Sequence, residues 1–368
     1  MIQIVETNYE HLLINLKYQT MNREEFKDHI LKLDRIIMTL PLNILPIGLF
    51  DGKMGLCIYY FQKAQLQDNP KYRTYAEKLL NDIYALVSEI TTIDFNIGIS
   101  GIAWGIHYIA EKQFVTGNID NTLREVDDLL FRTIQSEWLR DEKKKRRDFL
   151  WLLFYYSDRL RTIKNKTEKR LAQRTVIQII NHIEDNFSDT VWEEPLHLDL
   201  ESYELPLYLQ ILSKFYRLDF YNYKIIKIWE GLSSTVLSSM PVRHGNRLVL
   251  LSAIQETLKC VSMPQWKEHA ELLKTNIDHE RIIEQEFLNK NITLRRGLSG
   301  YCLLLSLQQE ELPPPLFKSR ILEKIEQSEI WDGRFNPRLN AFTGSTGLVN
   351  GYAGVSLIYE SLLKSTER

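Results

Sequence analysis

The sequence predicts an all-α fold, an α/α toroid of seven helix pairs with about fourteen helices. Glycine motifs recur along the chain at intervals of roughly 50 residues, a period typical of helical repeats. Amphipathic helical segments alternate with more apolar ones, and the period-two alternation typical of strands is scarce. Alternating helices without a sheet are expected to close into a ring, with the amphipathic helices outside and the apolar helices inside.

The glycine motifs hold 13 of the chain's 16 glycines, so glycine has a repeated structural role in this protein. Glycine lets two backbones approach closely and permits positive φ. The apolar helices that follow would direct free N–H groups and positive helix ends into one shared mouth. The five stretches are Gly48–Gly55, Gly98–Gly105, the weaker copy Arg243–Gly245, Gly297–Gly300 and Gly344–Gly354.

The outer helices are recognised by apolar residues spaced three and four apart, as at Phe26, Ile30 and Leu33. Pro313–Pro315 suits the entry to the last of them, because proline is tolerated at a helix start. The outer helices are expected at 26–40, 72–90, 119–139, 166–187, 221–239, 265–288 and 315–331. The inner helices are expected at 53–66, 101–114, 148–160, 204–216, 246–260, 299–309 and 351–364. The third and fourth inner helices lack the glycines but keep the spacing.

A single domain is expected over residues 1–368, since no linker is long or polar enough to divide the chain. Its repeats would start near residues 52, 101, 148, 204, 245, 297 and 351. An open helical solenoid is the alternative. The alternation of polar and apolar helices favours closure, because the helices of a solenoid are usually similarly exposed.

The composition is that of a globular protein, with 44% hydrophobic and 26% charged residues and a net charge of −2. Nothing in this balance favours nucleic acid or a membrane surface. No signal peptide is evident, and no apolar run approaches the ~18 residues of a membrane span. The three cysteines, Cys57, Cys260 and Cys302, are expected to be reduced thiols, which indicates a cytoplasmic protein. No phosphate-binding loop, dinucleotide fingerprint or His-Glu-x-x-His motif is present.

Two motifs resemble the repeat of the lanthionine synthetase C family. They are Gly-Leu-Val-Asn-Gly-Tyr-Ala-Gly-Val-Ser-Leu-Ile-Tyr at 347–359 and Ile-Ser-Gly-Ile-Ala-Trp-Gly-Ile-His-Tyr-Ile at 99–109. The resemblance extends over roughly residues 20–365 and implies a toroid of fourteen helices. It also implies a role in lanthipeptide maturation. Active members of the family hold one zinc ion at the mouth. The metal activates a peptide cysteine as thiolate, which adds to a dehydrated Ser or Thr and forms a thioether ring.

The chain departs from the family where the zinc ligands are expected. Arg295 and Arg296 stand where the sixth repeat of the family carries Cys-His, and Arg243 stands where the fifth repeat carries a ligand cysteine. Tyr203 is nearest to the position of the active-site histidine of the fourth repeat. Zinc binds deprotonated Cys, neutral His or carboxylate, and arginine stays protonated. We therefore expect no metal and no other cofactor, and whether any catalysis survives is left open.

The three arginines are the strongest candidates for a binding site. Guanidinium groups beside helix N-termini form an anion site for carboxylate or phosphate, such as an acidic peptide side chain. The alternative is internal ion pairing. The carboxylates available for it are Glu193, Glu194, Asp199 and Glu201. Trp104, Asn350 and Tyr352 lie at motif tips, where they would line a peptide groove or pack in the core or rim.

Asp148, His244 and Tyr203 are the candidate catalytic residues. The resemblance places a cavity carboxylate near Asp148, although this residue would equally serve as a helix cap. His244 would face the cavity beside Arg243 or be solvated. Asp51, before Gly52, would likewise cap a helix. His107, Cys57 and Cys302 lie inside apolar helices and are expected to be core residues.

Three functions remain open at this stage. The first is a family member without zinc that binds a peptide or a peptide-maturation protein, with no nucleic acid and no membrane span. The second is an α/α-barrel enzyme such as a glycan-processing hydrolase, which would need two cavity carboxylates, Asp148 with Asp51 or Glu204. The third is a non-catalytic scaffold. The basic run 143–147 would be a solvated loop, would bind an acidic leader peptide, or would pair with the acidic stretch 192–204.

Overall fold

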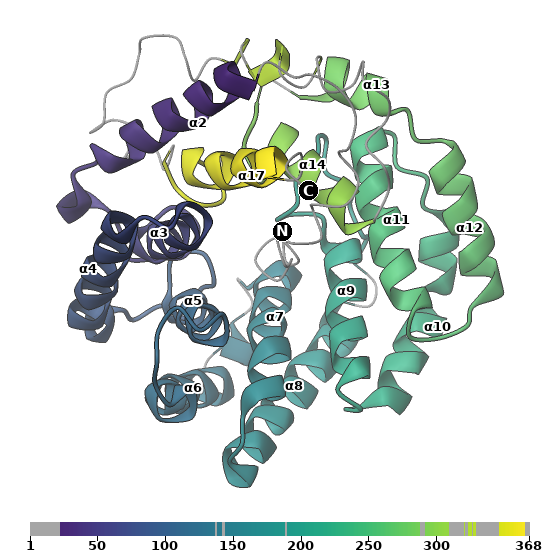
Figure 1. Cartoon of the computed structure of the whole chain (residues 1–368). Helices are drawn as coiled ribbons and strands as arrows, with labels where there is room; N and C mark the ends of the chain where they lie inside the picture. The colour runs from purple at the N-terminus through teal and green to yellow at the C-terminus, as the bar shows by residue number, and fades with distance from the viewer. Residues whose placement is uncertain are drawn as a thin grey trace.

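The fold is that of a helical toroid in a computed structural model (Figure 1). The structure describes residues 23–136, 138–141, 144–187, 190–287, 291–308, 320, 323–325, 327–328 and 346–364. Over these residues all regular secondary structure is helical and no β-strand occurs, as the sequence predicts. No helix in this part of the chain is long and apolar enough to span a membrane.

Among the residues that the structure describes, seven helices form the inner ring, and each begins close to a predicted inner segment. They are α3 (Lys53–Gln67), α5 (Ile99–Glu111), α7 (Arg146–Thr162), α9 (Glu204–Arg217), α11 (His244–Leu258), α14 (Leu298–Leu307) and α17 (Tyr352–Lys364). Other helices of the described part of the chain lie outside this ring (Figure 1). They are α2 (Arg23–Met38), α4 (Pro70–Leu86), α6 (Ile119–Ser136), α8 (Lys166–Phe187), α10 (Asn222–Ser238) and α12 (Pro264–Thr275). Short helical turns lie at Leu42–Ile44 (η2), Val87–Glu89 (η3), Trp138–Arg140 (η4), His279–Arg281 (α13) and Ile282–Glu286 (η5).

The inner helices close into a ring. Each contacts the next, in the order α3, α5, α7, α9, α11, α14 and α17, and α17 returns to contact α3. Closure confirms the toroid and excludes the open solenoid. The reason lies in the apolar content of the inner helices. In α7, for example, every residue from Phe149 to Leu160 is buried, so this helix must be covered on all sides.

Each outer helix packs on the inner helix that precedes it in the chain. Contacts pair α4 with α3, α6 with α5, α8 with α7, α10 with α9 and α12 with α11. The remaining outer helix, α2, packs on α17, so the first described helix completes the last pair. The short connection at Asp68 and Asn69 shows why α4 packs on α3, the inner helix that precedes it. Asp68 adopts the left-handed conformation at the end of α3, and the Asn69 side chain caps α4, so the two helices form a tight hairpin.

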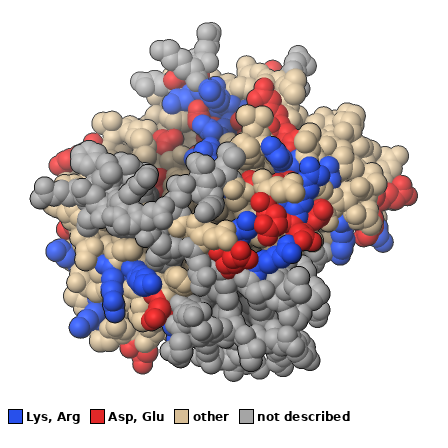
Figure 2. All heavy atoms as spheres, turned by 90° about the horizontal axis from the view of Figure 1, so that it is seen from above, with Lys and Arg blue, Asp and Glu red and all other residues tan. Residues whose placement is uncertain are grey.

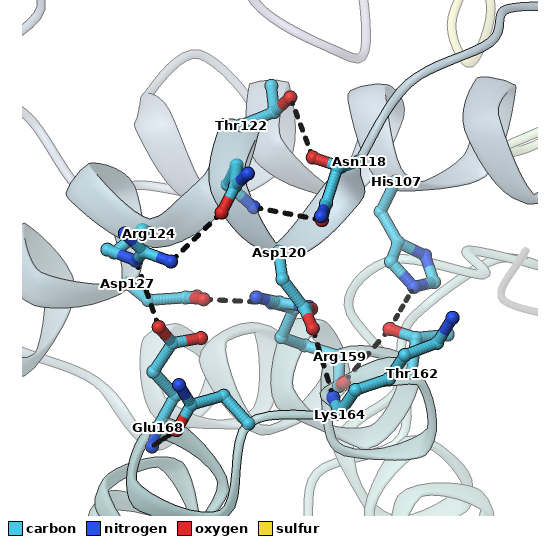
Figure 3. Close-up of polar contacts among 12 residues, drawn as sticks. His107, Asn118, Asp120, Thr122, Arg124, Asp127, Arg159, Thr162, Lys164 and Glu168 are labelled. Atoms are coloured by element: carbon cyan, nitrogen blue, oxygen red, sulfur yellow. Dashed lines mark hydrogen bonds and ion pairs between the residues drawn. The ribbon is translucent and has the colours of Figure 1, made fainter.

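Buried ion pairs fasten the outer helices to the inner ring. Arg159 of α7 is fully buried and bonds Asp120 and Asp127 of α6 at 2.7 and 2.8 Å (Figure 3). Asp120 also accepts a hydrogen bond from the backbone N–H of Lys164. His107, which the sequence assigns to the core, is buried in α5 with Nε2 2.8 Å from the hydroxyl of Thr162, and burial lowers its pKa.

One predicted outer helix needs correction, and most of another lies outside the described residues. The segment 265–288 is not one helix: α12 ends at Thr275, and two short helical turns, α13 and η5, follow Asp278. Asp278 causes the break, because its side chain caps the new turn by accepting the N–H of Arg281. Of the predicted helix 315–331, only Arg320 and the helical residues 323–325 and the turn at 327–328 fall within the described residues.

Candidate functional site

The repeated glycines build the mouth by letting each mouth loop fold back on its own helix. Gly52, Gly98 and Gly297 cap the N-termini of α3, α5 and α14 in extended conformation. A Cβ on any of them would lie under 3.0 Å from backbone atoms four and six residues earlier. Close approach, and not positive φ, therefore explains these glycines.

The second glycine of each motif meets a carbonyl of the same loop. A Cβ on Gly55, Gly101, Gly300 or Gly354 would lie under 3.0 Å from the carbonyl oxygen six residues before it. A Cβ at each of these positions would also meet a leucine of the neighbouring repeat. Gly101 faces Leu49, for example, and Gly300 faces Leu200. The motif thus joins each loop both to its own helix and to the next repeat.

Backbone hydrogen bonds link five mouth loops in one direction around the ring. The N–H of Leu200 donates to the carbonyl of Arg295, and the N–H of Arg295 donates to Val349. Val349 donates in turn to Phe50, and Phe50 to Asn96, over 3.0–3.2 Å throughout. Phe50, Asn96, Arg295 and Val349 each lie two residues before a motif glycine, so the repeat places equivalent residues side by side.

Polar side chains from these loops meet at the mouth, and we name them the mouth cluster. Its members are Asp51, Asn96, Asp199, Glu201, Arg295, Arg296 and Asn350. Asp199 accepts hydrogen bonds from Arg295 at 2.8 and 2.9 Å and from Arg296 at 2.7 Å. Glu201 forms an ion pair with Arg295 and accepts a 2.8 Å hydrogen bond from Asn96. The side-chain amide of Asn350 donates to Asp51 at 2.6 Å.

The two carboxyls at the ends of this cluster have opposite pKa shifts. Burial alone would raise the pKa of Asp199, but hydrogen bonds and charge from Arg295 and Arg296 outweigh it and lower the pKa. Burial raises the pKa of Asp51, and the negative charge of Glu201 adds to this, against the hydrogen bonds from Asn350. Asp51 therefore binds a proton more readily than an ordinary aspartate.

The structure pairs the mouth arginines internally, which is the alternative that the sequence left open. Asp199 and Glu201 neutralise Arg295, and Asp199 also holds Arg296, whose side chain remains 54% exposed. Arg243 lies apart: its backbone N–H donates to Glu194 and its side chain donates to the carbonyl of Leu196. The three guanidiniums therefore do not form one free anion site.

The N-terminus of α11 is also occupied by a carboxylate of the chain itself. Glu286 accepts the backbone N–H groups of His244 and Gly245, both at 2.8 Å. The His244 imidazole is directed toward residues 276–278, where its Nδ1 accepts the N–H of Asp278 at 3.1 Å. The expected cavity position of His244 is thus corrected: its ring belongs to the connection between α12 and α13.

The other two candidate catalytic residues lie at helix starts. Asp148 is in the first turn of α7, where its side chain accepts the backbone N–H of Lys145 at 3.0 Å. Tyr203 is the buried N-cap residue of α9, and burial together with Glu194 raises its pKa. Glu204 is paired with Arg146 at 2.7 Å. The carboxylates of the pairs proposed for hydrolysis are thus each bonded to another group of the protein: Asp148 to Lys145, Glu204 to Arg146 and Asp51 to Asn350.

The remaining motif-tip residues divide between mouth and core. Asn350 belongs to the mouth cluster. Trp104 is buried in α5, where its indole donates to Asp158 at 2.7 Å and stacks on Tyr108. Tyr352 begins α17, is half-buried, and has its pKa raised to about 12 by burial. Trp104 thus packs inside the ring and does not line the mouth.

Asn96 is the cluster residue that sequence reasoning missed, while Asp199 and Glu201 were considered only as partners for the arginines. A signal for Asn96 existed, because it occupies the same place as Arg295, two residues before a motif glycine. The loop of Asp199 and Glu201 precedes a helix without the glycine motif, so no comparable signal marks it.

The residues at the mouth do not fit a zinc site. Arg295 and Arg296 stand where the family resemblance places ligands, and both guanidiniums are committed to carboxylates. No grouping of three His, Cys, Asp or Glu suited to a metal ion occurs among the residues that the structure describes. Cys57 and Cys302 are buried within α3 and α14, and burial raises the pKa of Cys302 to about 12.

Charge on the face seen in Figure 2 is mixed. Acidic and basic side chains lie next to one another and no large area of a single sign appears there. The basic run shows the same compensation on a smaller scale. Arg146 lies over the ring of Trp192 at 3.5 Å and bonds the carbonyls of Thr190 and Val191 as well as Glu204. The acidic stretch is therefore an intramolecular partner of this part of the basic run.

Comparison with known proteins agrees with the fold. No curated protein matches the chain. The family described as lanthionine synthetase C-like protein matches residues 43–195, which cover α3 to α8 and the first two glycine motifs. The matched region begins at the first mouth loop and ends in the loop that leads to Asp199. Together with the closed ring of inner helices, this match shows that residues 43–195 are similar to the lanthionine synthetase C-like family.

Proposed function

We propose that this protein binds a peptide at the glycine mouth, as part of peptide maturation in the cytoplasm, without zinc and without thioether cyclase chemistry. One observation carries the proposal. The positions at which the family resemblance implies metal ligands hold Arg295 and Arg296, and both are fixed by Asp199. These guanidinium–carboxylate pairs at the mouth support the proposal.

The charge of the cluster favours a basic peptide group over an acidic one. Three carboxylates, those of Asp51, Asp199 and Glu201, face two guanidiniums. Asp51 is bonded to the neutral amide of Asn350 and lacks an ion pair with a guanidinium among the described residues. An ammonium or guanidinium group of a peptide would complete this balance. The sequence led us to expect an acidic side chain here, and the internal pairing of the arginines reverses that preference.

Apolar side chains around the mouth supply a second kind of contact. Ile97, Leu196 and Val242 lie on loops at the starts of inner helices and are 61%, 83% and 77% exposed. The loops of Leu196 and Val242 are joined by Glu194, which accepts the N–H of Val242 at 3.0 Å. Exposed apolar groups beside a polar cluster are typical of protein and peptide interaction sites.

The binding test compares two peptides that differ at one charged residue. Both carry the same apolar residues, and one has lysine where the other has glutamate. Isothermal titration should show the lysine peptide binding at least ~10-fold more tightly, a difference of about 1.4 kcal/mol. Asp51→Asn should remove this preference, and Asp148→Asn, at the start of α7, is the matched control. Equal affinity for both peptides would contradict a role for Asp51.

The absence of cyclase chemistry is tested separately. A dehydrated peptide with a free cysteine is incubated with the protein, with and without added zinc. The cysteine should remain open to alkylation in both cases, and elemental analysis should find zinc well below one ion per chain. Stoichiometric zinc together with loss of the alkylatable thiol would restore a cyclase function.

A carboxyl-based hydrolase is the second candidate, because Asp51 has a raised pKa and Glu201 contributes to the shift. Such pairs occur in glycoside hydrolysis, where one carboxyl must be protonated. Release of reducing sugar from a panel of glycans, abolished by Asp51→Asn, would favour this candidate over peptide binding. No release, with the peptide preference intact, would exclude it.

A further inference from the structure

A second cavity lies at the end of the ring opposite the glycine mouth. Its volume is about 490 Å³, and it is lined by the last turns of α5, α7, α9 and α11. The thirteen residues of α5 rise about 20 Å, which separates this cavity from the mouth loops. Trp104 and Phe154, packed 5.7 Å apart, lie between the two ends. The cavity is therefore a site distinct from the mouth cluster.

The walls of this cavity carry three ion pairs, each between neighbouring inner helices. Arg161 of α7 binds Glu111 of α5 through two hydrogen bonds. Lys214 of α9 lies 3.2 Å from Asp158 of α7. Further along the wall, Arg217 of α9 lies 2.6 Å from Glu256 of α11. Such pairs would fasten helix ends without an open space between them, so they do not account for the cavity itself.

The size and polarity of the space indicate a ligand. Small-molecule sites usually measure ~300–1,000 Å³ and combine apolar walls with a few polar groups. The neutral polar groups here come from Tyr108, Ser157 and Gln210. Asp158 is only 4% exposed, and Lys214 lies 4.5 Å above the ring of Phe154.

The charges around the cavity select the class of ligand. Four cations, Lys112, Arg161, Lys214 and Arg217, outnumber the three carboxylates by one. Four helix C-termini converge there, and each contributes roughly half a negative charge, about two in all, which more than offsets that excess. Each ion pair holds a cation and an anion side by side, so a purely anionic or purely cationic molecule would gain at one member and lose at the other. A molecule with both charges gains at both.

We propose that this cavity binds a zwitterion of short-peptide size, with a free ammonium group and a free carboxylate. The ammonium group is placed against Asp158 and Glu111. The carboxylate is placed against the exposed edges of Arg161 and Arg217, whose side chains are paired with Glu111 and Glu256 but remain 44% exposed. The proposal is independent of what the mouth binds, because no member of the mouth cluster lines this cavity.

The test titrates the full-length protein with triglycine, N-acetyl-triglycine and triglycinamide. The first has both charges, the second only the carboxylate and the third only the ammonium group. Triglycine should bind with a dissociation constant of ~1 mM or tighter. Each blocked form should bind at least ~10-fold more weakly. Equal binding of all three, tighter binding of a blocked form, or no binding of triglycine would each overturn the proposal.

Two variants locate the binding. Asp158→Asn should weaken triglycine binding at least ~10-fold, and Arg73→Gln, on the exposed face of α4, is the control and should bind as the wild type does. Gln210→Trp fills the cavity while leaving every ion pair in place. It should abolish binding without a change in melting temperature, and it replaces Asp158→Asn as the decisive variant if that protein does not fold. Binding that survives Gln210→Trp, or that is lost in Asp51→Asn at the mouth, would refute the assignment to this cavity.

Discussion

Asp199 holds both arginines of the mouth, so one carboxylate contacts the two cations of the cluster. Its pKa is below the unfolded value of about 3.9. A depressed pKa means that the folded state favours the carboxylate. The resulting stabilisation is fully present above pH ~4 and is lost as the pH falls through the folded pKa.

The prediction concerns the acid side of the stability profile. Between pH ~4 and ~2, the unfolding free energy of the wild type should fall more steeply than that of Asp199→Asn, which has no proton to gain at this position. At neutral pH the variant should be less stable by about 1–3 kcal/mol, because Arg296 loses its anion and Arg295 keeps only Glu201. Urea titrations at several pH values measure both effects. Asp128→Asn, on the exposed face of α6, is the control, and parallel profiles for wild type and Asp199→Asn would contradict the argument.

Gly300 and Gly231 make a matched pair at the same scale. A Cβ on Gly300 would collide with the carbonyl of Leu294, whereas a Cβ on Gly231, inside α10, has nothing within 4 Å. Gly300→Ala should therefore destabilise the protein by about 1–3 kcal/mol through overpacking. Gly231→Ala should stabilise it by about 0.5–1 kcal/mol, because alanine favours the helix. Thermal unfolding decides, and a similar shift for both variants would show that the mouth loops are not tightly packed.

At the scale of the element, α11 begins without the glycine cap used by α3, α5 and α14. Its first N–H groups are bonded by Glu286, which lies in the π-helical turn after α13. The break in the predicted helix 265–288 thus has a structural use. It brings a carboxylate to a positive helix end, where charge and hydrogen bonding both favour it.

Glu286→Ala should therefore cost about 1.5–3 kcal/mol for each charge-assisted hydrogen bond that is lost. Glu286→Gln keeps one acceptor oxygen and should cost less. Guanidinium denaturation measures both variants, and hydrogen exchange should show faster opening at the start of α11 than at its end. If exchange speeds up evenly through α11, or Glu286→Gln is as destabilising as Glu286→Ala, Glu286 does not act as a helix cap.

At the scale of the whole molecule, the ring closes on a buried polar group that joins α2, α3 and α17. Asp34 of α2 lies 2.6 Å from Lys63 of α3 and accepts the hydroxyls of Tyr59 and Ser356, both at 2.6 Å. Lys63 also pairs with Glu360 of α17, and its side chain is fully buried. Because these helices come from opposite ends of the described chain, this group stabilises closure and not any single repeat.

Asp34→Ala should destabilise the whole toroid by about 3–5 kcal/mol, because it removes one partner of a buried ion pair and leaves hydroxyl groups unpaired. The exposed pair Arg73–Glu77 provides the control, since both side chains are more than half exposed. Glu77→Ala should cost at most about 0.5 kcal/mol. Chemical denaturation of the two variants gives the comparison. A small effect of Asp34→Ala would mean that apolar packing of α2 on α17 suffices to close the ring.

The sequence by itself determined the all-α class, the alternation of inner and outer helices and the position of the mouth. Helix periodicity and the glycine motifs are local signals, because each is formed by residues only a few positions apart in the sequence. The inner helices at 148–160 and 204–216 were predicted correctly although they lack the glycines, because their apolar content is sufficient. The break at Asp278 was missed, because an Asx cap within an amphipathic run competes with helix continuation on nearly equal terms.

Only the tertiary structure decided which charged residues pair with one another. Asp199 and Arg295 are 96 residues apart, and nothing local marks Asp199, rather than Glu193 or Glu194, as the partner. The same holds for Asp34 with Lys63 and for the ion pairs of the second cavity. Electrostatic pairing depends on distance in space, and the packing of one repeat against another sets that distance. A sequence pattern contains the repeat, while the contacts between repeats exist only once the ring has closed.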